Sequence, residues 1–466
     1  MKSTAKLTII AVLVFCLAGA SFAGKKDRKL TVSAYLSSAK IEIISGDFER
    51  YQTAIAYLDS LFLHYGPHAE GLHLMAQIQV DYMTKETDPE KKLGYVEKLV
   101  AYIDSLHMCC DNKDINKKYK KDCDKLLDLN DSIKVQYWRE FYNTGIEQIK
   151  QLDEQQKGLA AATDSVDKAY FEEQSQATLN SCLTTMKMVS LLNPNDHRAY
   201  LGTSSAYEKV GDFDNAVEWL ARGLEVMKPE DDTLGQRSSL MLKAAFLNIQ
   251  KSDFCGAIPF FKGYIELNAN DTVNLGNLAI CYNNCGQYDT AAIINHQVLQ
   301  LDPANVDALI NLGRYHNQVA RNCTDTSNYF RKEGDEEAAK RWIAERDKAF
   351  DSSMVYFKKA VDANPDNIDA LEQYGTIVGL KSMYDEAATV FRKLADLDNA
   401  SPDYPRAAGD FFLRDQKFDD AIMEYERTVE RDPGDVETWE RLADLYENKG
   451  QTQKATAAKQ KIAELK

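Results

Sequence analysis

The sequence comprises 466 residues with a formal net charge of −16, and 44% of its residues are hydrophobic. This apolar fraction excludes wholesale disorder, and the content of only 10 Pro and 23 Gly excludes a collagen-like or linker-dominated chain. The acidic balance disfavours nucleic acid as a partner, because an acidic surface repels phosphate backbones.

The first residues have the pattern of a secretory signal peptide. Lys2 and Lys6 form a basic start, residues 7–19 are apolar and uncharged, and small residues stand on both sides of Phe22. We therefore expect a signal peptide at 1–23 with cleavage after Ala23. The alternative is a retained anchor, but the apolar run is shorter than the roughly 20 residues that span a bilayer. No later segment approaches that length, so we expect a mature chain that does not span a membrane and is exported to a bacterial periplasm or the exterior.

Export changes how the cysteines are interpreted. The chain has nine Cys, and eight remain after removal of 1–23. In an oxidising compartment an even number favours two or three structural disulfides, whose pairing stays open. The alternative for His107, Cys109, Cys110 and Cys123 is a zinc site, although the paired Cys-x-x-Cys spacing typical of zinc motifs is missing.

The N-terminal part, 24–196, is predicted to be a divergent helical region. Residues 69–83 and 91–108 have the pattern of one helix pair. Residues 116–192 carry two long helical patterns, separated near 158–164. Alternating Val/Ile/Thr stretches are absent, so no strand is expected.

A short pattern recurs in the rest of the chain. It consists of Gly, a polar residue, an aromatic residue, Asp, any residue and Ala. Two copies are variants, one with Ser-Met and one with Gln-Lys at the first two positions. The copies are Gly211–Ala216, Gly286–Ala291, Ser382–Ala387 and Gln416–Ala421. An Asp-Pro or Asn-Pro stop follows about twelve residues after several copies, and a small residue precedes the aromatic by about ten. Such self-similarity, at a period near 34 residues, indicates an array of helix hairpins.

This pattern resembles the tetratricopeptide repeat family. Residues 272–305 match its consensus at Leu278, Ala279, Tyr282, Gly286, Tyr288, Ala291 and Pro303. Residues 436–466 match it at Trp439, Leu442, Ala443, Tyr446, Gly450 and Ala455. Further matches lie at 197–230, 368–401 and 402–435. The resemblance implies an all-α solenoid, a right-handed superhelix of antiparallel helix hairpins, with the repeats over 197–466 and about nine helix pairs in all.

Each recurring position of the repeat has a physical role. The small residue lets the second helix approach closely, and the residue before the aromatic ends the first helix at positive φ, which Gly adopts most easily. The Ala of the recurring pattern lies where the two helices cross. Pro at the end of the repeat cannot continue a helix, so the chain turns into the next hairpin.

Two repeats depart from the pattern. Pro259 falls inside the second helix expected for 238–271, which predicts a kink or a late start. The repeat that opens at Val306 contains roughly 28 extra residues, judged by the 34-residue period. We expect a helical insertion near 320–350 that projects from the solenoid, with the second helix appearing near Ser353. Its Trp342 suggests an alternative role, homo-oligomerisation of a structural envelope protein.

No catalytic motif emerges. The Gly-rich phosphate loops, H-E-x-x-H and G-x-S-x-G are all absent. We therefore predict no enzyme activity, no catalytic or metal-binding residues and no cofactor. The rival hypothesis, an enzyme or metal module in the N-terminal third, would need converging His, Cys and acidic residues, and Cys123 and Cys182 are the only His or Cys between 115 and 195.

The resemblance also implies a ligand surface. In the family, positions near 2, 5, 6, 9, 12 and 13 of each first helix face the ligand, whereas the alternative is that they are ordinary solvated positions. The candidate partner-binding residues are Asn277, Asn283, Asn284, Asp307, Asn311, Arg314, Asn317, Gln373, Arg406 and Arg441. Asn side chains can bond the backbone of a protein or peptide partner. The sequence thus predicts an exported interaction scaffold or adaptor, with a role in cell-envelope assembly or secretion.

Overall fold

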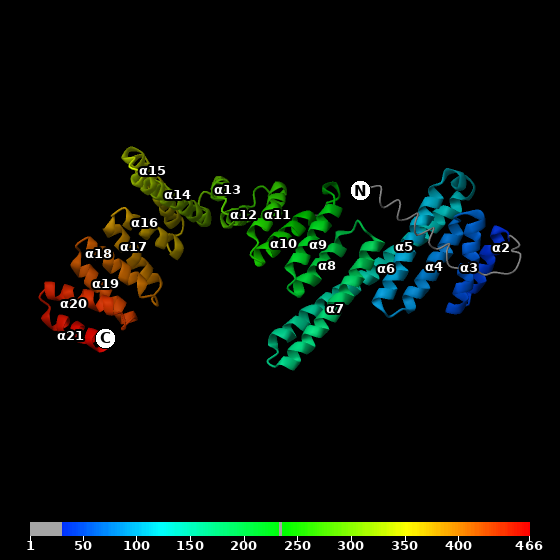
Figure 1. Cartoon of the computed structure of the whole chain (residues 1–466), viewed down its shortest axis with the longest axis horizontal. Helices are drawn as coiled ribbons and strands as arrows, with labels where there is room; N and C mark the ends of the chain where they lie inside the picture. Colours follow the sequence, from blue (N-terminus) through cyan, green and yellow to red (C-terminus); the bar gives the residue numbers. More distant parts are fainter. Residues whose placement is uncertain (1–29, 233–234) are drawn as a thin grey trace. The chain divides into compact units, whose positions relative to one another are not determined.

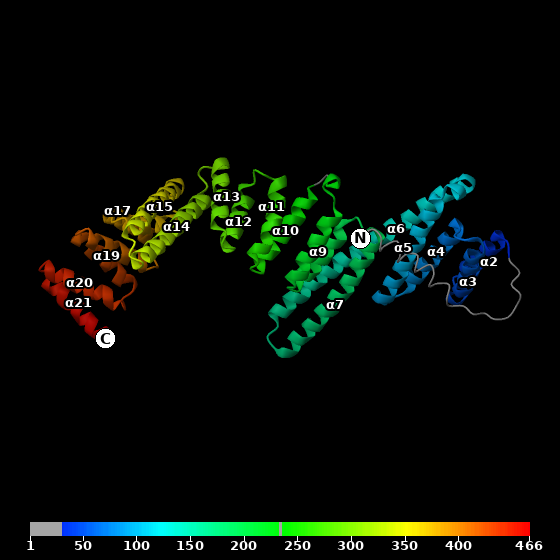
Figure 2. The same cartoon turned by 45° about the horizontal axis from the view of Figure 1, so that its top comes forward.

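The computed structural model describes residues 30–232 and 235–466, so the predicted signal peptide at 1–23 lies outside the described residues. Within these ranges the chain forms twenty α-helices, one short 3₁₀ segment at Pro229–Asp231, and no strand (Figures 1 and 2). The predicted all-α class is confirmed. About nine helix pairs correspond to eighteen helices, so the sequence pattern came within two helices of the observed count.

The chain divides into two compact units, the first ending at Lys251 and the second beginning at Ser252. The boundary predicted at 196/197 coincides with the start of a helix at His197. The helices of the first unit are α2 (Val32–Ile44), α3 (Phe48–Tyr65), α4 (Ala69–Lys85), α5 (Pro89–Asp111), α6 (Lys113–Ala161), α7 (Ser165–Leu192), α8 (His197–Lys209), α9 (Phe213–Val226) and α10 (Gln236–Gln250). The two long helices expected within 116–192 are therefore α6 and α7, which pack along each other.

The second unit contains the clearest repeats. Its helices are α11 (Phe254–Leu267), α12 (Thr272–Asn284), α13 (Tyr288–Leu301), α14 (Val306–Lys332), α15 (Glu336–Ala363), α16 (Ile368–Leu380), α17 (Tyr384–Leu397), α18 (Asp403–Arg414), α19 (Phe418–Arg431), α20 (Val436–Asn448) and α21 (Thr452–Leu465). From α12 onward, each first helix packs against the second helix that follows it, and each second helix packs against the next first helix. The helix-hairpin solenoid predicted for this part of the chain is confirmed.

The turn between the two helices of a repeat adopts the left-handed conformation that the pattern predicts. Gly211, Gly286 and Gly450 have φ of 78°, 73° and 69°. The same turn position is occupied by Ser252, Ser382 and Gln416 in three other repeats, and these residues also have positive φ, between 60° and 64°. A side chain at such φ values costs conformational energy, so these three turns are held by the packing of their helices rather than by local preference.

Small residues lie where the helices of a hairpin cross. A Cβ at Gly313 would come within 2.5–2.8 Å of ring atoms of Phe357, and one at Gly409 within 2.7–3.1 Å of the ring of Tyr425. Both aromatic side chains are fully buried. The repeated Ala is at most 3% exposed at Ala216, Ala257, Ala291, Ala387, Ala421 and Ala455. Small residues therefore let the two helices of a hairpin approach each other closely.

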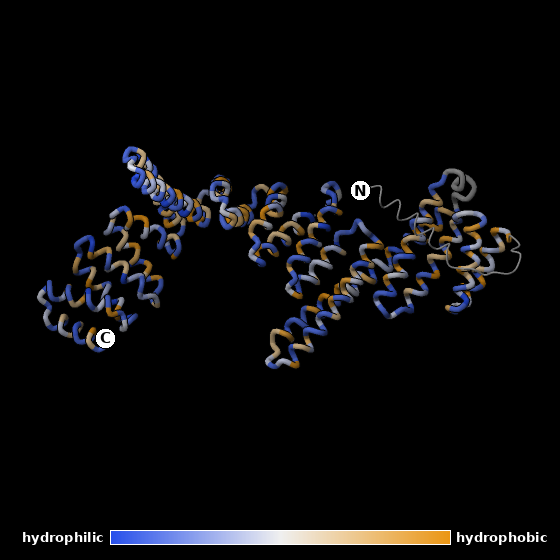
Figure 3. Tube along the Cα trace, viewed as in Figure 1, coloured by the Kyte–Doolittle hydropathy of each residue, from blue (hydrophilic) through white to orange (hydrophobic). Residues whose placement is uncertain are grey.

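The insertion lengthens one hairpin of the second unit. Its helices α14 and α15 comprise 27 and 28 residues, compared with 13 for α12. The second helix thus begins at Glu336 rather than near Ser353 as expected, because Asp335 caps it by accepting from the backbone N–H of Ala338 at 2.9 Å. Hydrophilic residues predominate on the outer part of this hairpin in Figure 3, and Trp342 on it is 38% exposed.

Pro259 does not delay the start of its helix. Helix α11 begins at Phe254, where Asp253 accepts a hydrogen bond from the N–H of Gly256 at 2.8 Å. Pro259 lies in the second turn, so the helix loses only the bond that its missing N–H would have donated. The expectation of a late start was wrong because the cap at Asp253 establishes the first turn.

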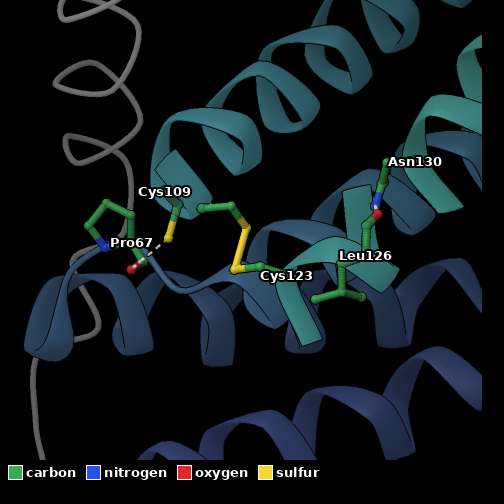
Figure 4. The surroundings of a disulfide bond; sticks show 6 residues. Pro67, Cys109, Cys123, Leu126 and Asn130 are labelled. Carbon is green, nitrogen blue, oxygen red and sulfur yellow. Dashed lines mark hydrogen bonds between the residues drawn. A yellow bond between two sulfur atoms is a disulfide. The ribbon is translucent and has the colours of Figure 1, made fainter. Parts of the chain in front are cut away.

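Four of the cysteines form two disulfides. The bridge Cys110–Cys123 joins the end of α5 to α6, and the bridge Cys255–Cys285 joins α11 to the end of α12. The remaining cysteines of the described residues, Cys109, Cys182, Cys281 and Cys323, are buried thiols. In Figure 4, Cys109 lies beside the first bridge and directs its Sγ at the backbone oxygen of Pro67, 3.6 Å away.

None of the helices within 30–232 and 235–466 combines the length and the apolar composition that a bilayer-spanning segment needs.

We expect Gly313→Ala to destabilise the second unit by about 1–3 kcal/mol, because its Cβ would overlap the buried ring of Phe357. Gly276→Ala on α12 is the matched control, since no atom lies within 4 Å of its added Cβ. That control should be stabilising by about 0.5–1 kcal/mol through helix propensity. Urea unfolding followed by circular dichroism would measure both. Equal effects of the two substitutions would contradict the role assigned to Gly313.

We expect Gln416→Gly to raise stability by about 0.4–1 kcal/mol, because glycine relieves the cost of a φ of 60°. Gln451→Gly is its control, because Gln451 is also exposed but has a φ of −84°. Glycine there relieves no positive φ, so it should change the midpoint less than Gln416→Gly does. The measurement is the thermal unfolding midpoint, and a rise for Gln451→Gly with a fall for Gln416→Gly would refute the explanation.

Candidate functional site

The ten predicted partner-binding residues lie on five first helices of the second unit, α12, α14, α16, α18 and α20. Neighbouring first helices from α14 to α20 are linked by side-chain hydrogen bonds and ion pairs. The residues on α14 to α20 therefore belong to one surface. We call this surface, together with the preceding first helix α12, which packs against α13, the first-helix face.

The amide side chains on α12 and α14 differ in how they are engaged. Asn277 donates to Asn274 Oδ1 at 3.1 Å, and Asn284 donates to the backbone oxygen of Ile280 at 2.9 Å. The side chains of Asn283, Asn311 and Asn317 make no hydrogen bond to any described residue, and all three are partly accessible. Each of them therefore retains a donor and an acceptor for another molecule.

Asp307, at the start of α14, also has no partner among the described residues, and it is exposed. Its carboxylate adds a negative charge next to the unpaired amides of the same helix. The amino-terminal half of the first-helix face thus offers uncharged donors and acceptors together with an unpaired acid.

Arg314 is engaged within the protein. Its guanidinium donates to both carboxylate oxygens of Asp369 on α16, at 2.7 and 2.9 Å. Gln373 donates to the same carboxylate at 3.4 Å. The structure thus brings Arg314 and Gln373 together around Asp369, and the ion pair joins two adjacent repeats.

Arg406 and Arg441 are engaged in the same way. Arg406 on α18 donates to Asp435, the cap of α20, at 3.3 Å and also pairs with Asp403. Arg441 on α20 pairs with Asp410 of α18 and donates to Glu437 at 2.6 Å. Burial and the nearby charge of Arg406 lower the pKa of Arg441. The two arginines therefore lie close together, each bound to acids of its own repeat and the neighbouring one.

A buried tyrosine adds hydrogen bonds to the ion pair between Arg441 and Asp410. Tyr425 donates its hydroxyl to Asp410 at 2.6 Å, and Arg441 donates to the same hydroxyl at 3.3 Å. Burial, aided by the charge of Glu437, raises the pKa of Tyr425, so it stays protonated and continues to donate. The carboxylate of Asp410 is therefore held between a phenol and a guanidinium.

A hollow that the sequence did not predict lies on the second unit. It is about 310 Å³ in volume and lies between the start of α13 and the middle of α14. Its lining includes Gly286, Tyr288, Asp289, Tyr315 and Gln318. Tyr315 donates to Asp289 at 2.8 Å, and burial together with this bond raises the pKa of the tyrosine. The sequence signal was present in the recurring turn at 286–291, which we interpreted only as a structural marker.

The cluster of His107, Cys109, Cys110 and Cys123, for which zinc binding was the alternative, contains a disulfide. Cys110 and Cys123 are bonded to each other, and His107 lies 3.0 Å from Asp131. In the described part of the chain, no group of three or more His, Cys, Asp or Glu side chains is arranged to hold a metal ion. Two of the four donors of the suggested zinc site are therefore consumed by a disulfide.

Comparison with known proteins bears on the repeats themselves. Residues 424–457 match the family model described as tetratricopeptide repeat, over the second half of α19, the whole of α20 and the start of α21. The chain contains a tetratricopeptide repeat. No curated protein matches the sequence.

Several solved tetratricopeptide repeat proteins are similar to part of this chain at low identity. One from Parabacteroides merdae is 13% identical, with 58% of this chain and 93% of that chain covered and a TM-score of 0.35. One from Thermus thermophilus is 18% identical, with 45% and 98% covered and a TM-score of 0.28. The protein YrrB, described as having an unusual peptide-binding site, is 20% identical, with 45% and 91% covered and a TM-score of 0.28.

The arrangement favours binding of uncharged ligand groups over binding of a ligand carboxylate. The three arginines of the first-helix face are paired with acids, so an anionic ligand would have to displace these pairs. The unpaired amides of α12 and α14 can instead satisfy the N–H and C=O groups of a polypeptide backbone.

We expect a double-mutant cycle of Arg314→Ala and Asp369→Ala to give a coupling energy of about 0.2–1 kcal/mol, because both side chains are about half exposed to solvent. The charge-swapped pair, Arg314→Asp with Asp369→Arg, should recover much of the loss of either single reversal. Urea unfolding of the four proteins gives the coupling. A value indistinguishable from zero would show that this pair does not join the repeats.

Proposed function

We propose that the protein is an exported, non-enzymatic scaffold that binds a segment of a partner polypeptide on its first-helix face, in cell-envelope assembly or secretion. The observation that carries this proposal is the set of unpaired amides at Asn283, Asn311 and Asn317. Support for export comes from the sequence of 1–23, which has the features of a signal peptide.

The surrounding structure supports recognition by this face. Stacked repeats create an extended surface on which side chains from several first helices contact one ligand. The ion pairs of Arg314, Arg406 and Arg441 fix neighbouring first helices relative to one another. A surface fixed in advance loses less conformational entropy when a partner binds. The arginines thus have a positioning role, and the amides make the contacts.

The test begins with a peptide-display selection against immobilised residues 24–466, which supplies a peptide ligand as the probe. The variant Asn283→Ala/Asn311→Ala/Asn317→Ala should bind this peptide at least about tenfold more weakly, since each lost hydrogen bond is worth about 0.5–1.5 kcal/mol. Isothermal titration calorimetry gives the dissociation constants.

The control is Gln297→Ala/Gln300→Ala/Gln460→Ala, which removes three exposed amides from the second helices α13 and α21. It should bind the peptide as the parent does. Failure to enrich any peptide, or equal affinities of the amide variant and the parent, would overturn the proposal.

A further inference from the structure

The two disulfides differ in their access to solvent. Cys110 and Cys123 are 3% and 1% exposed, within the packed core between α5 and α6. Cys255 is exposed in the first turn of α11, and Cys285 at the end of α12 is partly accessible. Thiol–disulfide exchange requires a thiolate to reach a sulfur atom, so the accessible bridge is the reactive one.

The Cys255–Cys285 bridge joins the turn after α12 to the first turn of α11. The backbone bonds of this turn run from Cys285 to Cys281 at 3.1 Å, from Gly286 to Asn283 at 3.0 Å and from Gln287 to Tyr282 at 2.9 Å. Gly286 and Gln287 then form one wall of the hollow beside α14. The bridge therefore fixes both the end of α12 and the wall of the hollow to α11.

A nearby thiol does not compete for this bridge. Cys281 is one turn earlier on α12 and fully buried, and burial raises the pKa of its thiol to about 11. At neutral pH it is a protonated thiol rather than an attacking thiolate. Opening of the bridge consequently depends on a thiol from outside the protein.

We infer that Cys255–Cys285 is a redox-sensitive clamp, which a dithiol reductant opens while Cys110–Cys123 remains closed, and whose opening loosens the turn 283–287. A thiolate of the reductant attacks Sγ of Cys255, and Cys285 leaves as a thiolate. The second thiol of the reductant then displaces Cys255 from the mixed disulfide. Two electrons and two protons pass from the dithiol to the two cysteines, and the reductant becomes a cyclic disulfide. Asn283, one of the amides proposed to contact the peptide, lies in this turn, but the tests below measure the bridge and the turn without a peptide.

The test treats the folded chain, residues 24–466, with increasing concentrations of dithiothreitol at pH 7.5, followed by alkylation and peptide mapping by mass spectrometry. Cys255 and Cys285 should become alkylated at least about tenfold faster than Cys110 and Cys123. Equal rates for the two bridges, or faster reaction of the buried one, would overturn the inference.

Hydrogen exchange tests the mechanical part. The amides of Cys285, Gly286 and Gln287 should exchange several-fold faster in the selectively reduced chain and in the variant Cys255→Ser/Cys285→Ser than in the oxidised parent. The amides of α20, remote from the bridge in sequence, serve as the internal control and should not change. If the variant and the oxidised parent exchange alike over 283–287, the bridge does not clamp this turn.

Discussion

The close approach of two helices at a small residue is the constraint on which the rest of the structure depends. Where Gly313 or Gly409 faces an aromatic ring, the ring fills the space that a Cβ would take, and the hairpin closes around it. The repeated Ala is likewise almost fully buried. Because one hairpin cannot bury its apolar face alone, neighbouring hairpins of the array pack against each other.

The fold of the repeats was predictable from the sequence because each repeat contains residues that mark where its helices begin and end. The turn at Gly286 and the stop at Pro303 mark both ends of α13, and the observed helix lies between them. The long hairpin was harder to place. The period showed that residues had been inserted after Val306, but the cap at Asp335, which sets the start of α15, is one acidic residue within a run rich in charge.

The site was predictable by position but not by partners. The family pattern places Arg314 on the first-helix face, yet it does not show that Asp369 of the next repeat would hold it. That contact depends on the offset between two helices, and the two residues it joins are 55 positions apart in sequence. The sequence also does not show whether the side chains of Asn283 and Asn317 are hydrogen-bonded. That depends on all of their neighbours in space and not only on their own repeat. The disulfide pairing was open for the same reason.

The elongated α14–α15 hairpin has a consequence for how this array can change. Helix α14 has 27 residues and α12 has 13, so α14 is longer by 14 residues. At the helical rise per residue, this extra length is roughly 21 Å. The base of the hairpin keeps the ordinary spacing at Gly313, so the added length leaves neighbouring packing undisturbed. The outer part of this hairpin can therefore gain or lose whole helical turns while the packing of the repeats at its base stays the same. At this position the protein can extend its surface without a change of fold.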